Sequence, residues 1–152
     1  MTTKINPFAA APADIKRWLD FSQATAGTLD KSLALLIEIR ASQINGCANC
    51  INMHTADARA HGETEQRIYL LSAWHEAPCY TDSERAALAW TDALTRISHE
   101  HPQAEAKAAL DAHFSPEEQV RLTLMINVIN GWNRIAIGFD MWNDVPATEK
   151  AA

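Results

Sequence analysis

The sequence predicts an all-helical fold, and three observations lead to that prediction. Only five glycines and six prolines in 152 residues leave little turn chemistry for a many-stranded sheet. Alanine, leucine and glutamate, which favour helices, are plentiful. No segment shows the strong alternation of apolar and polar residues that is typical of half-buried strands. We therefore expect a helical bundle of six or seven helices.

Proline, glycine and capping residues mark four helices in the first half of the chain. Pro12 fits a first helical turn, Asp30 and Thr64 fit helix caps, and Gly27 and Gly62 fit helix ends. The expected helices cover residues 12–26, 30–45, 47–61 and 64–73.

Two capping boxes mark helices in the second half. They are Thr81-Asp82-Ser83-Glu84 and Ser115-Pro116-Glu117-Glu118. The first predicts a helix to about residue 97 and the second a long apolar helix to about residue 139, with a weaker helix near 104–113 between them. Asn133 and Arg134 interrupt the long helix, and they face either a site or a subunit interface.

Length and composition predict one globular domain over residues 1–152. Thirteen Lys and Arg residues against nineteen Asp and Glu give a formal net charge of −6, with no basic cluster. This balance argues against nucleic acid or an anionic membrane as the main partner. The first residues contain no apolar run of signal-peptide length, and no stretch approaches a membrane span. We expect a cytoplasmic protein.

The segment that carries chemistry is Cys47-Ala48-Asn49-Cys50-Ile51-Asn52-Met53-His54. On a helix, Cys47, Cys50 and His54 fall on one face. The preceding Asn45-Gly46 places Cys47 at the helix N-terminus, where the helix dipole stabilises a thiolate. Two thiols at this spacing can close into a disulfide with little backbone movement, and a histidine one turn on can take a proton.

Two other interpretations of this segment stay open at this point. Cysteines are often small buried hydrophobes, so the pair could be inert core. Cys47, Cys50 and His54 could also supply three zinc ligands, with His75 or Cys79 as the fourth, although no second ligand pair completes a structural site.

The run from Glu38 to His54, with the core S-Q-x-N-G-C-x-x-C-x-x-x-H, resembles the alkylhydroperoxidase D / carboxymuconolactone decarboxylase-like family. The stretches 83–90 and 130–136 resemble later parts of its small peroxidase-like members. The resemblance implies an all-helical bundle that assembles as a homo-oligomer, a trimer, hexamer or dimer. It also implies reduction of a hydroperoxide without a cofactor or metal, with recharging by a dithiol reductant, a lipoyl-bearing or thioredoxin-like protein.

The resemblance also assigns roles to individual residues. Cys50 corresponds to the cysteine that attacks the peroxide, Cys47 to its disulfide partner, and His54 to the histidine of the proton relay. The family's relay glutamate is replaced by Leu35, and the histidine before its second cysteine by Asn49. Glu38, about 60° around the same helix from Leu35, is the candidate substitute, against the alternative of a solvated surface glutamate.

Three functions follow as hypotheses. The first is a thiol peroxidase or disulfide oxidoreductase in antioxidant defence, and the cysteine pair favours it. The second is a lyase acting on a lactone-like acid, as in the decarboxylase branch. The third is a non-catalytic, redox-responsive oligomeric protein. Consumption of peroxide with a dithiol reductant separates the first from the other two.

Overall fold

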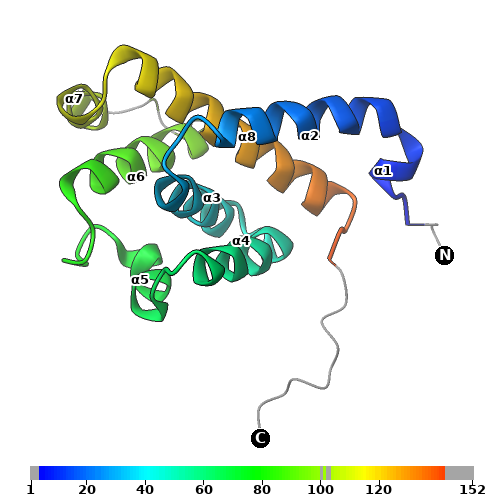
Figure 1. Ribbon diagram of the computed structural model, residues 1–152, viewed down its shortest axis with the longest axis horizontal. Coiled ribbons are helices and arrows are strands. Elements are labelled where there is room, and N and C mark those ends of the chain that lie inside the picture. Colours follow the sequence, from blue (N-terminus) through cyan, green and yellow to red (C-terminus); the bar gives the residue numbers. More distant parts are fainter. Residues whose placement is uncertain (1–3, 100, 102–103, 143–152) are drawn as a thin grey trace, which may run out of the picture.

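The structure is a computed structural model that describes residues 4–99, 101 and 104–142. These residues form eight α-helices and one 3-10 turn, and they contain no strand (Figure 1). The all-helical prediction is therefore confirmed. The elements are α1 (Pro7–Ala10), α2 (Pro12–Ala26), α3 (Lys31–Asn45), α4 (Ala48–Ala60), α5 (Glu65–Leu70), η1 (Leu71–Ala73), α6 (Asp82–Thr95), α7 (Ala104–His113) and α8 (Pro116–Gly138).

The helix bounds predicted from the caps and breakers agree closely with the structure, with two differences. Both capping boxes are formed, because Thr81 and Ser115 accept the backbone N–H of the glutamate three residues on, and that glutamate accepts theirs in return. The one-turn helix α1 was not expected. It forms because the Asn6 side chain accepts the Phe8 N–H, with a proline in the first turn. The segment expected as one helix over residues 64–73 is an α-helix only to Leu70 and continues as the 3-10 turn η1.

Helix α3 lies at the centre of the bundle and packs against α4, α6 and α8. Its apolar side chains are divided between two core clusters. Leu35, Leu36 and Ile39 join the cluster formed with α4, α5 and α6, whereas Ile37 and Ala41 join the cluster formed with α6, α7 and α8. A helix that is apolar on several sides is buried on several sides, and here this burial fixes the position of α3.

A buried ion pair joins α3 to α6. The Arg40 guanidinium donates from Nε and Nη2 to the two carboxylate oxygens of Asp92, at 2.6 and 2.7 Å, and Arg96 donates to the same carboxylate at 2.9 Å. Burial opposes ionisation of this carboxyl, but the hydrogen bonds from Arg40 and Arg96 hold the pKa of Asp92 below its usual value. Asp92 is therefore ionised at neutral pH.

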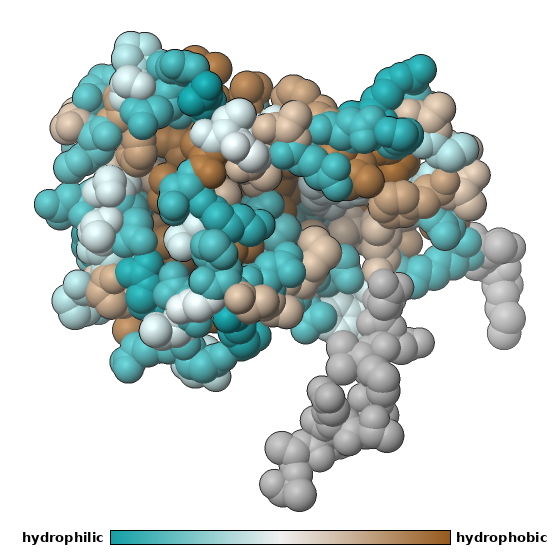
Figure 2. Space-filling view, viewed as in Figure 1, coloured by the Kyte–Doolittle hydropathy of each residue, from teal (hydrophilic) through white to brown (hydrophobic). Residues whose placement is uncertain are grey.

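The N-terminal helices form an arm that lies across α8, at the upper right of Figure 1. Trp18 of α2 packs into the second core cluster and lies over Gly131 of α8. The arm also leaves Phe8, Leu19 and Phe21 exposed, and Figure 2 shows apolar surface mixed with polar surface on this side. Across the described part of the chain, every helix is too short or too polar to span a bilayer.

The contact between Trp18 and Gly131 gives a packing prediction. A Cβ at residue 131 would lie 2.5 Å from a ring carbon of Trp18, so Gly131→Ala forces the Trp18 ring or the helices to shift. We expect a loss of about 1–3 kcal/mol in the free energy of unfolding, measured by urea denaturation. Gly138→Ala in the same helix is the control, because a Cβ there meets nothing within 4 Å. Equal effects of the two substitutions would contradict this account.

The Arg40–Asp92 pair gives a pH-dependent prediction. Asp92→Asn leaves a buried guanidinium without its counter-charge, and we expect a loss of about 3–5 kcal/mol at pH 7. A carboxyl with a lowered folded-state pKa contributes its stability above its unfolded pKa of about 3.9 and loses it as the pH falls through the folded value. The difference between the wild type and the variant therefore shrinks below about pH 4. Asp14→Asn, which removes an exposed pair with Arg17, is the control and costs less than about 1 kcal/mol. A pH-independent difference for Asp92→Asn would refute the assignment.

Candidate active site

A tight turn between α3 and α4 positions the first cysteine. Gly46 ends α3 with a φ of 68°, in the left-handed region that glycine adopts at little cost. The Cys47 N–H then donates to the carbonyl of Ser42 at 3.0 Å. Cys47 is itself the N-cap of α4, and its Sγ accepts the Cys50 N–H at 3.4 Å. Because the sulfur occupies a helix N-terminus, a thiolate at Cys47 is stabilised there.

Cys47 and Cys50 form a disulfide, with their Cα atoms 5.4 Å apart. Both residues are buried, to 1% and 2% exposure, and they pack with Ala136 of α8 and with Met141. His54, one turn beyond Cys50 on α4, is also buried. Cys50 and His54 thus lie one turn apart on α4, whereas Cys47 is the N-cap of that helix, and the Cα distance of the two cysteines lies inside the usual range for a disulfide.

Glu38 faces His54 across the interface between α3 and α4. Its Oε2 lies 3.2 Å from the Nδ1 of His54, and the two side chains are only 12% and 10% exposed. The solvated surface position considered for Glu38 is therefore wrong, because α4 packs over this face of α3. The two atoms are close enough for an ion pair, but their geometry is not that of a hydrogen bond, so the His54 Nδ1 has no hydrogen-bond partner.

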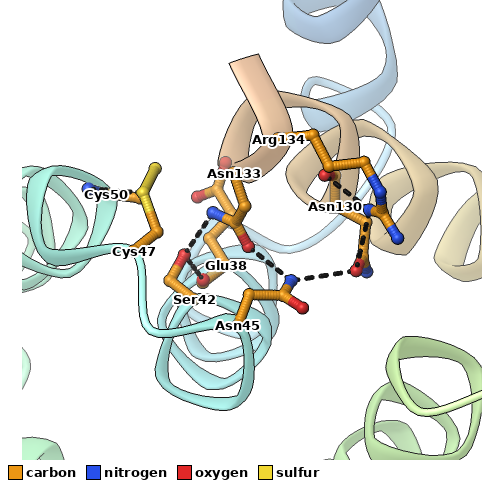
Figure 3. The surroundings of a disulfide bond; sticks show 8 residues. All are labelled: Glu38, Ser42, Asn45, Cys47, Cys50, Asn130, Asn133 and Arg134. Carbon is orange, nitrogen blue, oxygen red and sulfur yellow. Dashed lines mark hydrogen bonds between the residues drawn. A yellow bond between two sulfur atoms is a disulfide. The ribbon is translucent and has the colours of Figure 1, made fainter. Parts of the chain in front are cut away.

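An amide cluster holds the end of α3 against α8 (Figure 3). The Asn45 Nδ2 donates to the Oδ1 of Asn130 at 2.9 Å and to the Oδ1 of Asn133 at 2.8 Å. The Asn133 Nδ2 donates to the Ser42 hydroxyl at 3.0 Å, and this hydroxyl donates to the Glu38 carbonyl at 2.7 Å. The cluster holds the turn that carries Cys47 against α8. It also explains why Asn130 and Asn133 stand in an otherwise apolar helix, because both side chains bind the end of α3.

A cavity of about 460 Å³ opens beside Cys50. Cys50 and His54 line it together with Glu38. Its walls also include apolar side chains from α1, α2, α4 and α8: Phe8, Leu19, Met53, Val128, Trp132 and Ala136. Cys47 does not line it, so the two sulfurs differ in access.

The other residues considered from the sequence lie partly in the core and partly at the cavity. Leu35 is fully in the core, Asn49 lines the cavity, and Cys79 packs beside the first core cluster. Within the part of the chain that the structure describes, no three His, Cys, Asp or Glu side chains are grouped as metal ligands would be. The donors considered for zinc therefore do not converge there.

Sequence reasoning missed the partners that lie on other helices. The roles of Asn45, Asn130 and Ser42 were not expected, although Asn130 is a polar residue in an apolar helix and precedes Asn133 by one turn. Lys31 also lines the cavity and was not expected there, and Asp57 lines it as well.

This arrangement can perform dithiol chemistry. Cys50 is the sulfur that a ligand in the cavity can approach, His54 lies next to it on the helix, and Glu38 provides negative charge beside the imidazole. Cys47 lies within bonding distance of Cys50 and has an N–H donor for its sulfur. An accessible thiol, a base and a resolving thiol are thus present together.

Comparisons with known proteins agree with this site. The sequence profile of the Carboxymuconolactone decarboxylase family matches residues 13–93. The uncharacterized protein YdfG of Bacillus subtilis (strain 168) is 42% identical over 138 residues, which are 90% of this chain and 94% of that protein.

Solved structures share the fold. A protein of unknown function from Agrobacterium tumefaciens, suggested to be the antioxidant defence protein AhpD, is 43% identical, with a TM-score of 0.90 over 95% of this chain and 99% of that one. A debrominase variant in complex with 2,3,4-tribromopyrrole is 17% identical, with a TM-score of 0.81 over 91% of this chain and 74% of that one, and it shows similarity of fold alone. With its helical bundle, its cysteine pair and these relatives, the chain belongs to the carboxymuconolactone decarboxylase family, in its AhpD-like form.

Proposed function

We propose that the protein is a cofactor-free thiol peroxidase and disulfide oxidoreductase that reduces hydroperoxides. The observation that carries the proposal is the cavity that reaches Cys50 and also contains His54 and Glu38. A role in antioxidant defence is supported by the description suggested for the relative from Agrobacterium tumefaciens. The fold allows other chemistry, because a debrominase shares it.

The peroxide step uses Cys50 as the nucleophile. Its thiolate attacks one oxygen of the O–O bond, so an S–O bond forms, the O–O bond breaks, and the alcohol leaves with a proton from His54. Cys50 is then a sulfenic acid. Glu38 lies beside the imidazole of His54, with its Oε2 3.2 Å from Nδ1.

The second step closes the disulfide. The Cys47 thiolate, stabilised at the N-terminus of α4, attacks the Cys50 sulfur, so the S–S bond forms, the S–O bond breaks, and hydroxide leaves and takes a proton from solvent to become water. An external dithiol then attacks the disulfide at Cys50, because this sulfur lines the cavity, and Cys47 leaves as a thiolate. Both cysteines are buried, which favours a slender dithiol such as a lipoyl arm over a cysteine fixed on a protein surface.

Assembly and compartment complete the proposal. A homo-oligomer is supported by the large apolar side chains that stay exposed on the arm, such as Phe8 and Phe21. Location in the cytoplasm stays a prediction from the sequence.

The cysteine roles are tested by mass spectrometry after one equivalent of peroxide. Cys50→Ser is expected to abolish the oxidation, whereas Cys47→Ser is expected to stop at a trappable sulfenic acid on Cys50. Cys79→Ser is the control and keeps wild-type reactivity, since Cys79 lies outside the cavity lining. The opposite pattern would reverse the two roles. A lyase would keep its activity without either cysteine, and a redox-responsive oligomer would change its assembly without turnover.

The relay is tested by substituting its two other members. His54→Ala is expected to slow peroxide reduction by about 10²–10⁴-fold, with partial recovery as the pH is raised and the thiolate forms without help. Glu38→Gln is expected to slow it less, since Glu38 acts through His54. Glu76→Gln, an exposed carboxylate outside the cavity, is the control. Stopped-flow measurement of the first turnover reports each rate. A rate for His54→Ala that equals the wild type at every pH would exclude the relay.

A further inference from the structure

The backbone of Cys47 is hydrogen-bonded to two helices. Its N–H donates to the Ser42 carbonyl of α3 at 3.0 Å, and its carbonyl accepts the N–H of Ile51 in α4 at 2.9 Å. Gly46 is the single residue between the end of α3 and Cys47. The position of the Cys47 sulfur therefore depends on how firmly the last turn of α3 is held.

Asn133 of α8 binds that last turn at two points (Figure 3). Its Nδ2 donates to the Ser42 hydroxyl at 3.0 Å, and its Oδ1 accepts from the Asn45 Nδ2 at 2.8 Å. The Asn133 side chain is only 1% exposed, and Ser42 is buried too. Hydrogen bonds in such a place are stronger than those in water, so the two bonds fix the turn against α8.

Asn130, one turn before Asn133, fixes the orientation of the amides. Its Nδ2 donates to the Thr95 hydroxyl of α6 at 3.0 Å and to the Ile126 carbonyl at 2.9 Å. Its Oδ1 is therefore the atom that faces Asn45, and Asn45 donates both to it and to Asn133. The amide cluster thus has one consistent pattern of donors and acceptors.

The same part of α8 contacts the sulfurs. Ala136, three residues after Asn133, packs against Cys47 and Cys50. In the oxidised protein the disulfide holds the Cys47 side chain in place. In the reduced protein the bonds to the last turn of α3 have to keep the Cys47 thiol near Cys50. A thiol held near its target loses less freedom when the bond closes, so closure is faster and more favourable.

We propose that Asn133 is a positioning residue for the disulfide step, because it holds the turn from which Cys47 attacks Cys50. The proposal rests on the function proposed above and assigns a residue to the second step of the same cycle. Asn133 acts through Ser42 and Asn45. The attack of Cys50 on the peroxide does not depend on it.

The test measures the balance of dithiol and disulfide without peroxide. The full-length protein is equilibrated in mixtures of reduced and oxidised dithiothreitol, quenched with acid and alkylated, and the disulfide fraction is read by mass spectrometry. Asn133→Leu is expected to lower the equilibrium constant for disulfide formation about fivefold to thirtyfold, because the reduced turn gains freedom that closure has to remove.

Asn133→Leu changes the size of the side chain little and removes both bonds. Ser42 still donates to the Glu38 carbonyl, and Asn45 still donates to Asn130, so we expect the variant to fold. Ser42→Ala removes one of the two bonds and is the second variant. It is expected to lower the constant in the same direction by a smaller factor.

Thr123→Val is the matched control. It removes a hydrogen bond from Trp90 that joins α6 to α8, ten residues before Asn133 on the same helix, and is expected to leave the constant unchanged. An unchanged constant in Asn133→Leu, or an equal fall in Thr123→Val, would overturn the proposal. If Asn133→Leu does not fold, Ser42→Ala decides in the same way.

Peroxide separates the two steps and the two proposals. In Asn133→Leu we expect the Cys50 sulfenic acid to form at the wild-type rate and to close to the disulfide more slowly, as measured by stopped flow and quenched mass spectrometry. Equal slowing of both steps would contradict the positioning role. A wild-type protein that peroxide does not oxidise at Cys50 would refute the peroxidase function, whereas the equilibrium in dithiothreitol would still test Asn133.

Discussion

The burial of α3 on several sides is the constraint on which the rest of the structure depends. Its residues Ala34–Ile37 and Ile39–Ser42 are all buried, and the helix contacts α4, α6 and α8. The side chains around such a helix are closely packed, so the helix has little freedom to shift. Since Gly46 alone separates α3 from the capping residue Cys47, the fixed position of α3 also fixes the cysteine pair.

The polar side chains of α3 are divided between structure and site. Arg40 points toward α6 and forms its ion pair with Asp92 there, far along the sequence. Glu38, Ser42 and Asn45 recur at helical spacing on another face and meet α4 and α8. A buried polar group is costly unless it has a partner, so these contacts favour the observed arrangement of the helices around α3.

Access to the sulfur is the second constraint on function. Both cysteines are nearly inaccessible, yet a cavity of about 460 Å³ reaches Cys50. Part of its wall is apolar, and Glu38 and His54 lie within 3.2 Å of each other at the same cavity.

The sequence by itself determined the helices and the dithiol motif, and only the tertiary structure decided what faces that motif. Helix ends depend on contacts within a few residues, as in the Thr81–Glu84 capping box and the Gly46 turn before Cys47. Their positions can therefore be predicted from the neighbouring sequence. The approach of Glu38 to His54 depends instead on how α4 packs on α3. The bond between Asn45 and Asn130 joins residues 85 positions apart, and the cavity is formed by walls from separate helices. Such contacts follow from the packing of whole helices, which no local pattern encodes.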